Sequence, residues 1–198
     1  MMIIGLTGPT GAGKTTALDV LRGMGFTVID CDALYYDLLK TDESLRSDIR
    51  AAFGDVFSSD GQLNRPALAE AVFGSEKKLA QLDKIVARAM NAAVDKIIAS
   101  CRGRGVVIDA IKLIESGLGE KCDLTVGLTA PEEVRLKRIM QRDGIDEAYA
   151  KQRIAAQKKD SFYKKHCMFL LENRAGSQKQ FQQLIREFFS DMIEDMEG

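Results

Sequence analysis

The sequence contains little of the chemistry that metal centres and disulfide frameworks require. Its 198 residues include four cysteines and one histidine, His166. The cysteines show no C-x-x-C spacing, so they predict isolated thiols in place of a zinc site or a disulfide frame. A single histidine cannot form a multi-histidine metal site, and we expect His166 to be structural or solvated. The reducing cytoplasm is the setting that suits such thiols.

Long apolar runs and an excess of one charge are also missing. No segment reaches the roughly 18 apolar residues of a membrane span, and the N-terminal MMIIGLTG lacks the basic start of a targeting segment. The formal net charge of -1 gives no long-range attraction toward nucleic acid or an anionic membrane. The sequence therefore predicts a soluble protein with one main domain and without nucleic-acid or membrane partners.

Short apolar runs that end in turn residues predict a sheet of about five strands. These runs lie at 2–7, 27–30, 106–109, 124–129 and 168–173. Helical patterns separate them, and strands that alternate with helices pair in parallel. We therefore expect an α/β fold with a parallel sheet.

Two of the segments between strands are longer than a crossover requires. Helical patterns fill about 75 residues between the second and third strands, although a crossover needs only about a dozen. This predicts an inserted helical subdomain at about 34–101. Helices rich in Lys and Arg, broken at Asp143-Gly144, predict a mobile cationic lid at about 139–166. The core then comprises about 1–33, 102–138 and 167–198.

A phosphate-binding motif follows the first strand and precedes a helix. The match to G-x-x-x-x-G-K-[ST] consists of Gly8, Pro9, Thr10, Gly11, Ala12, Gly13, Lys14 and Thr15. Glycines let backbone N–H groups enclose a triphosphate at close range. We expect Lys14 to reach the β- and γ-phosphates of ATP and Thr15 to offer its hydroxyl to Mg²⁺. Thr16 completes the expected ATP-binding set.

Acidic residues end two of the strands, where ligands of open parallel sheets bind. Asp30 and Asp32 bracket Cys31, and either can orient a hydroxyl acceptor and take its proton. The other acid is then a candidate helix cap or a Mg²⁺ ligand. Asp109 ends the run VVID and is a second Mg²⁺ candidate, with a helix or turn cap as its alternative role.

Arginines of the cationic segment are candidates for a phosphate clamp. Arg138, Arg142 and Arg153 can stabilise the transferring phosphate as a lid closes. For each of them the alternative is a solvated helix face.

In their order along the chain, these motifs resemble the dephospho-coenzyme A kinase family. GLTGPTGAGKTT is similar to its phosphate loop, FTVIDCD to its acidic strand, and GQLNRPALAEAVF to a segment with an arginine near the acceptor. VVIDAIKLIESGL resembles a segment that usually reads D-x-P-L-L-x-E. LKRIMQRDG and RIAAQ resemble the lid, and LLENRAGS resembles the border of the adenine site.

The resemblance implies a P-loop kinase-like three-layer fold with a helical acceptor domain and a lid. It implies transfer of phosphate from ATP, with Mg²⁺, to the ribose 3′-hydroxyl of dephospho-coenzyme A. We expect a monomer or weak homo-oligomer. The site residues that we assign on this basis are Asp32 as base with Lys14 and Arg142 as catalytic partners; Asn173 with the nucleotide; Thr7, Asp32, Arg65, Asp109 and Glu115 with the acceptor; and Thr15, Asp30 and Asp109 with the metal.

Three departures from the family's usual pattern lie on the acceptor side. They are Ala87-Arg88 in place of His-Pro, Ile111-Lys112-Leu113 in place of Pro-Leu-Leu, and Tyr36 in place of a basic residue. A kinase for a nucleoside, nucleotide or sugar acid is therefore an alternative. A second alternative is a nucleotide-dependent switch, but its N-K-x-D signature has only the helical segment 157–160 (QKKD) as a near match.

Overall fold

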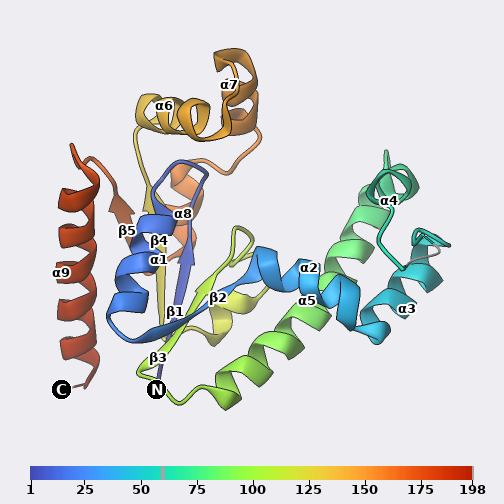
Figure 1. The fold of residues 1–198 in the computed structure, drawn as a ribbon, viewed down its shortest axis with the longest axis horizontal. Helices are drawn as coiled ribbons and strands as arrows, with labels where there is room; N and C mark the ends of the chain where they lie inside the picture. Colours follow the sequence, from blue (N-terminus) through green and yellow to red (C-terminus); the bar gives the residue numbers. More distant parts are fainter. Residues whose placement is uncertain (59–60, 198) are drawn as a thin grey trace. The chain divides into compact units, whose positions relative to one another are not determined.

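The computed structural model describes residues 1–58 and 61–197 of the chain. It divides into two compact units (Figure 1). The first combines Met1–Val28 with Arg102–Gly198, and the second is the continuous segment Ile29–Cys101. Over the described residues, no helix is both long and apolar enough to cross a membrane.

A five-stranded sheet in the order β2-β3-β1-β4-β5 confirms the predicted α/β class. Parallel pairing joins β1 to β3 and to β4, and β4 to β5. The strands are β1 Met2–Thr7, β2 Phe26–Asp30, β3 Gly105–Asp109, β4 Leu124–Thr129 and β5 Phe169–Glu172. Each predicted strand agrees with an observed one to within a residue at either end. This agreement arises because apolar runs bounded by turn residues are typical of buried parallel strands.

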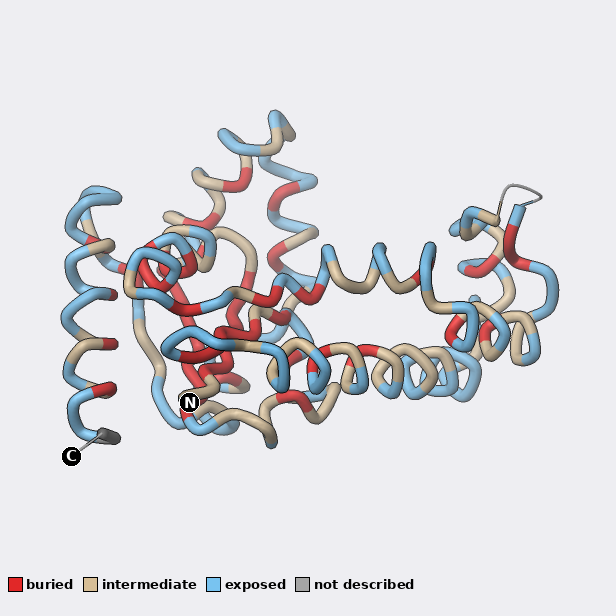
Figure 2. Tube along the Cα trace, turned by 60° about the horizontal axis from the view of Figure 1, so that its bottom comes forward, coloured by how far each residue is buried: buried red, intermediate tan, exposed pale blue. Residues whose placement is uncertain are grey.

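Alternate side chains of the central strands pack against helices on the two faces of the sheet. Ile4 of β1 and Val126 of β4 belong to a buried cluster that includes side chains of α1 (Lys14–Gly23) and α9 (Gln178–Glu197). Their neighbours Gly5 and Gly127 face the other way, and a Cβ at Gly127 would lie 3.0 Å from Cβ of Tyr163 in α8 (Asp160–His166). Figure 2 shows the buried residues on the strands and on the side of α9 that faces them. Successive residues of a strand point to opposite faces, so the sheet lies between two helical layers.

The second unit is mainly helical. It contains α2 (Cys31–Thr41), α3 (Glu43–Phe53), α4 (Arg65–Val72) and α5 (Glu76–Ser100). The residue before each helix accepts a hydrogen bond from a backbone N–H three residues later, and these caps are Asp30, Asp42, Asn64 and Ser75. Buried side chains form its own core, composed of Leu39, Leu45, Ile49, Val56, Phe57 and Leu68.

Two consecutive helices, α6 (Glu132–Asp143) and α7 (Glu147–Ala155), form a hairpin between β4 and α8. In Figure 1 they follow one another at an angle, and they share a small cluster of Ile139, Ala150 and Ile154. Gly144, with φ of 64°, ends α6 in a left-handed conformation that favours glycine. Residues 132–155 are called the helical hairpin below, and the roles of lid and acceptor domain stay predictions.

Candidate active site

The phosphate loop connects β1 to α1, as the motif predicts. Gly13 takes φ of 108°, a left-handed value, and a Cβ there would lie 2.7 Å from Nδ2 of Asn173. Glycine is therefore required for both conformation and space at this position. The helix α1 starts at Lys14, so the N-terminal end of its dipole faces the loop.

Asn173 holds the loop from the end of β5. Its Nδ2 donates to the Ala12 carbonyl at 3.0 Å, and its backbone N–H donates to the Thr129 carbonyl at 2.7 Å. The residue is only 2% exposed. Its side-chain amide therefore hydrogen-bonds to the loop backbone while its own backbone hydrogen-bonds to β4, and its assignment to the nucleotide stays a prediction.

Lys14 and Thr15 occupy the first turn of α1. The Lys14 ammonium donates to the Gly8 carbonyl at 3.2 Å, which folds its side chain back over the loop. Thr15 is exposed, and Thr16 is half-buried. A cation over the loop and an exposed hydroxyl beside it are the groups that a bound triphosphate and its metal ion need.

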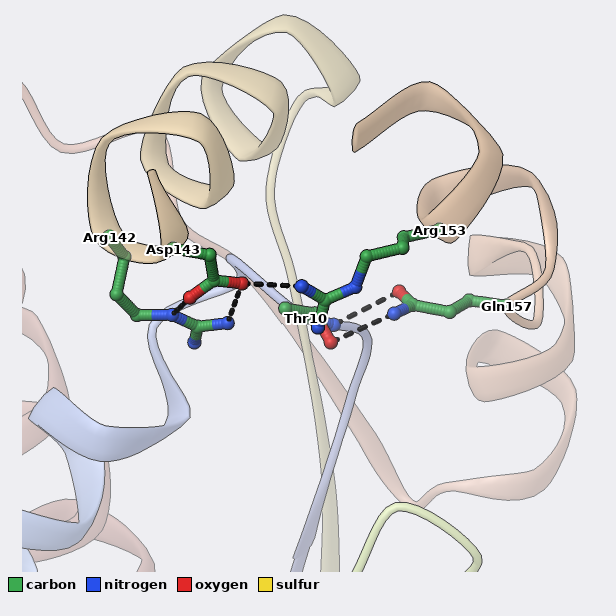
Figure 3. Close-up of polar contacts among 5 residues, drawn as sticks. All are labelled: Thr10, Arg142, Asp143, Arg153 and Gln157. Carbon is green, nitrogen blue, oxygen red and sulfur yellow. Dashed lines mark hydrogen bonds and ion pairs between the residues drawn. The ribbon is translucent and has the colours of Figure 1, made fainter. Parts of the chain in front are cut away.

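One carboxylate joins two of the three arginines predicted as a phosphate clamp. Arg142 Nε lies 2.6 Å from Asp143, and Arg153 Nη1 lies 2.5 Å from the same carboxylate (Figure 3). The hydrogen bond from Arg142 is the main cause that lowers the pKa of Asp143 to about 2. The third arginine, Arg138, donates to the Gly11 carbonyl at 3.1 Å. Two guanidinium groups of the helical hairpin are therefore paired with Asp143, and a third contacts the loop.

Two residues that the sequence analysis missed also bind the loop. Arg135, 6% exposed, donates from Nε to the Thr10 carbonyl at 3.0 Å. Its other guanidinium nitrogen Nη2 donates to Oε1 of Gln157 at 2.8 Å. Burial lowers the pKa of Arg135, but a guanidinium group stays protonated in proteins. Helix periodicity provided a signal, because Arg135 lies one turn before buried Ile139 on the same face of α6.

The carboxyl ends of β1 and β3 bring further predicted residues together. Thr7 is buried, and its hydroxyl donates to the Ile111 carbonyl at 3.2 Å. Asp109 ends β3 and is half-buried, and its strand register pairs it with Leu6, next to Thr7. Glu115 lies 3.8 Å from the ammonium of Lys158. Thr7 therefore supports the segment after β3, while Asp109 lies at the edge of the sheet from which the loop starts.

The structure separates the two roles that the sequence left open for Asp30 and Asp32. Strand β2 ends at Asp30, and α2 begins at Cys31. Oδ1 of Asp30 caps this helix by accepting from the Ala33 N–H at 2.9 Å. Asp32 lies exposed in the first turn. Asp30 precedes the helix with an extended backbone, whereas Asp32 belongs to its first turn, so the two carboxylates have different surroundings.

Residues that depart from the family pattern make contacts within the second unit. The guanidinium of Arg65 lies 4.6 Å from the ring centroid of Tyr36, a cation–π contact. Arg88 forms an ion pair with Asp48, which connects α5 to α3. Arg65, which we expected near the acceptor, therefore lies over the ring of Tyr36.

The glycine-rich loop, the parallel sheet around it and the arginine-bearing hairpin define a P-loop kinase. A family model described as dephospho-CoA kinase matches residues 2–179. The chain belongs to this family, which confirms the resemblance found in its motifs.

Known proteins resemble the chain over its length. A Corynebacterium diphtheriae protein named dephospho-CoA kinase is 33% identical over 201 residues, covering 100% of both chains. A crystal structure from Thermus thermophilus superposes with a TM-score of 0.77 at 27% identity, covering 98% of this chain and 97% of the other. The dephospho-CoA kinase structure from Campylobacter jejuni gives a TM-score of 0.58 at 20% identity, with 96% of each chain covered, and supports the fold alone.

Proposed function

We propose that the protein transfers the γ-phosphate of ATP to the ribose 3′-hydroxyl of dephospho-coenzyme A, the last step of coenzyme A synthesis. One observation carries the proposal: a complete phosphate loop, with Lys14 at the start of α1, in a chain that the family model matches over residues 2–179. The loop provides the phosphate chemistry, and the family specifies the acceptor.

The backbone of the loop and four side chains contribute to ATP binding in this proposal. The N–H groups of the loop enclose the phosphates, and Lys14 exchanges its contact with the Gly8 carbonyl for the β- and γ-phosphates. Arg142, paired with Asp143, provides positive charge where the transferring phosphate becomes more negative. Asn173 and Thr16 complete the nucleotide site.

The residues present fit a Mg²⁺ ion that binds mainly through the nucleotide. No cluster of three His, Cys, Asp or Glu that could hold a metal occurs among the residues that the structure describes. Mg²⁺ commonly takes one or two protein oxygens and leaves its other positions to phosphates and water. The exposed Thr15 hydroxyl and the Asp109 carboxylate are oxygen ligands of this kind, and Asp30 retains a second carboxylate oxygen beyond its cap. The ion would neutralise phosphate charge during transfer.

On the acceptor side, we assign Asp32 as the group that orients the ribose hydroxyl and accepts its proton. Its carboxylate is exposed in the first turn of α2, whereas that of Asp30 caps the same helix. Arg65 and the ring of Tyr36 provide a charged and an aromatic surface for the acceptor. Thr7, Asp109 and Glu115 complete the proposed acceptor set.

A screen of hydroxyl acceptors tests the proposed function directly. We expect ATP consumption with dephospho-coenzyme A and background rates with adenosine, a mononucleotide and a sugar acid, measured as ADP release. The matched control is a dephospho-coenzyme A analogue that lacks the ribose 3′-hydroxyl, which should bind without accepting phosphate. Faster phosphorylation of a nucleoside or sugar acid than of dephospho-coenzyme A would contradict the assignment.

The cellular setting and assembly follow from the same proposal. We assign the protein to the cytoplasm, without nucleic-acid or membrane partners, as a monomer or weak homo-oligomer. All four cysteines are free thiols, which suits a reducing compartment. Burial raises the pKa of Cys122 to about 12 and that of Cys167 to about 11, so neither forms much thiolate at neutral pH.

The segment 135–165 should lose further mobility when both substrates bind, beyond the contacts that Arg135, Arg138 and Gln157 already make with the loop. It contains ten Lys or Arg and four Asp or Glu, a difference of +6, and clustered cations repel until phosphates neutralise them. We expect slower amide hydrogen exchange in this segment with a non-hydrolysable ATP analogue and acceptor than without ligand, while α9 exchanges equally in both states. Equal exchange of the segment in both states would rule out ligand-driven closure.

Acid should weaken the ion pairs of Asp143 with Arg142 and Arg153, which lie within this segment. The folded protein lowers the pKa of Asp143 from 3.8 to about 2, so the pairing contributes stability above the unfolded value. That contribution disappears as the pH falls from about 4 toward 2. At neutral pH the Asp143 carboxylate is fully charged, and its ion pairs with Arg142 and Arg153 are kept.

A further inference from the structure

We propose that Gln157 is a positioning residue for the phosphate loop, which it fixes through Thr10 before the nucleotide binds. The inference rests on the proposed role of this loop as the ATP site. Gln157 lies between α7 and α8, at the end of the segment RIAAQ that resembles the lid, and neither the motif nor the resemblance gives it a role of its own. Its side chain contacts a residue 147 positions earlier in the chain.

The amide of Gln157 makes a two-point contact with Thr10 (Figure 3). Its Oε1 accepts from the Thr10 backbone N–H at 3.0 Å, and its Nε2 donates to the Thr10 hydroxyl at 2.8 Å. Two hydrogen bonds to different atoms of one residue fix its backbone and its side chain together. A single bond would leave the residue free to rotate.

The buried cation of Arg135 fixes the orientation of this amide. Arg135 Nη2 donates to Oε1 of Gln157, which therefore accepts from two donors, and Nε donates to the Thr10 carbonyl. A flipped amide would direct its NH₂ group at both donors, so only the present orientation satisfies all three bonds. The N–H, carbonyl and hydroxyl of Thr10 are all held from the side of the hairpin and the segment after it.

The consequence for binding follows from conformational entropy. A glycine-rich loop has many conformations to lose when it encloses phosphates. If contacts already hold the loop before binding, its conformational entropy is lost when the protein folds. The nucleotide then binds to a prearranged loop. Removing the Gln157 contacts should therefore weaken nucleotide binding while leaving the buried core intact, because Gln157 is only half-buried.

The test compares Gln157→Leu with wild type in the full chain. Gln157→Leu removes three hydrogen bonds, one of them from the Arg135 guanidinium. Loss of the two neutral bonds to Thr10 should raise the ADP dissociation constant and the KM for ATP by roughly tenfold. The KM for dephospho-coenzyme A and the melting temperature should stay unchanged. Hydrogen exchange at the Thr10 amide should accelerate in the nucleotide-free protein, because its acceptor is gone. Gln157→Glu retains an acceptor for the Thr10 N–H and should show a smaller increase.

Two further variants separate positioning from a general structural effect. Gln152→Leu changes an exposed glutamine on α7 and should leave ADP affinity at the wild-type value. Thr10→Val removes the hydroxyl partner, and its effect should be less than additive with Gln157→Leu, because both break the same bond. A Gln157→Leu protein with wild-type ADP affinity would overturn the proposal, as would a loss of ADP affinity that only accompanies a lowered melting temperature.

Calorimetric binding of ADP needs no acceptor, so the inference can fail or hold independently of the proposed reaction. If wild type binds ADP but does not phosphorylate dephospho-coenzyme A, the proposed function fails. A tenfold weaker ADP affinity in Gln157→Leu would still support the role of Gln157. If wild type phosphorylates dephospho-coenzyme A and Gln157→Leu binds ADP normally, only the positioning role fails.

Discussion

Lys14→Ala should lower kcat by about 10²- to 10³-fold, the scale seen when one preorganised charge contact to a transition state is lost. The Lys14 side chain is half-buried, and its ammonium donates to a loop carbonyl. Its removal therefore takes a cation from the phosphates without opening the core. Steady-state kinetics at saturating acceptor, with a melting curve for each protein, measure both effects.

Lys14→Met is the matched control, because it keeps most of the aliphatic stem and loses only the charge. Both variants should lose activity to a similar extent and melt close to wild type. Wild-type turnover by a well-folded Lys14→Ala protein would remove the loop from the mechanism. A large drop in melting temperature for Lys14→Ala but not for Lys14→Met would attribute part of the loss to packing.

Asp32→Asn should lose mainly kcat, by about 10²- to 10⁴-fold, and retain wild-type affinity for ATP. The amide keeps the shape of the side chain but can neither accept the acceptor proton nor carry its charge. Asp32 is exposed in the first turn of α2, so the change leaves its helix in place. Single-turnover rates and ATP dissociation constants separate the chemical step from nucleotide binding.

Asp30→Asn is the matched comparison on the same turn. Asparagine keeps an oxygen for the Ala33 N–H and caps helices about as well as aspartate, so α2 should remain formed. The lost charge should instead weaken Mg²⁺ or nucleotide binding. A collapsed kcat for Asp30→Asn with a near-normal value for Asp32→Asn would reverse the two assignments. Near-normal values for both would exclude this pair from the reaction.

The parts of the fold set by local sequence were predictable. The apolar runs of β1 and β4 end in turn residues, and both strands were predicted to the residue. The phosphate loop was equally clear, because its glycines meet a conformational need that few residues fulfil. The end of α6 at Gly144 follows from the same property.

Contacts between distant segments were not predictable from pattern alone. Arginine is usually exposed, so we did not expect Arg135 in the interior. The structure buries it against the loop. Gln157 and Thr10 meet only because the chain after α7 returns to the loop, which no local spacing reveals. The sequence left open which of Asp30 and Asp32 caps a helix, for a local reason. Asp30 ends β2 and caps α2 at once, and periodicity does not show which residue is the cap in so abrupt a change.

The pairing of β1 also has a consequence for synthesis on the ribosome. Met2 of β1 pairs with Gly105 of β3, so the first strand must wait for 103 further residues before its partner is translated. At roughly 5–20 residues per second this delay is about 5–20 s. The second unit, continuous from Ile29 to Cys101, is synthesised in full during that time. The apolar first strand therefore emerges early and pairs late, and nascent chains halted before β3 should be the ones that depend most on chaperones.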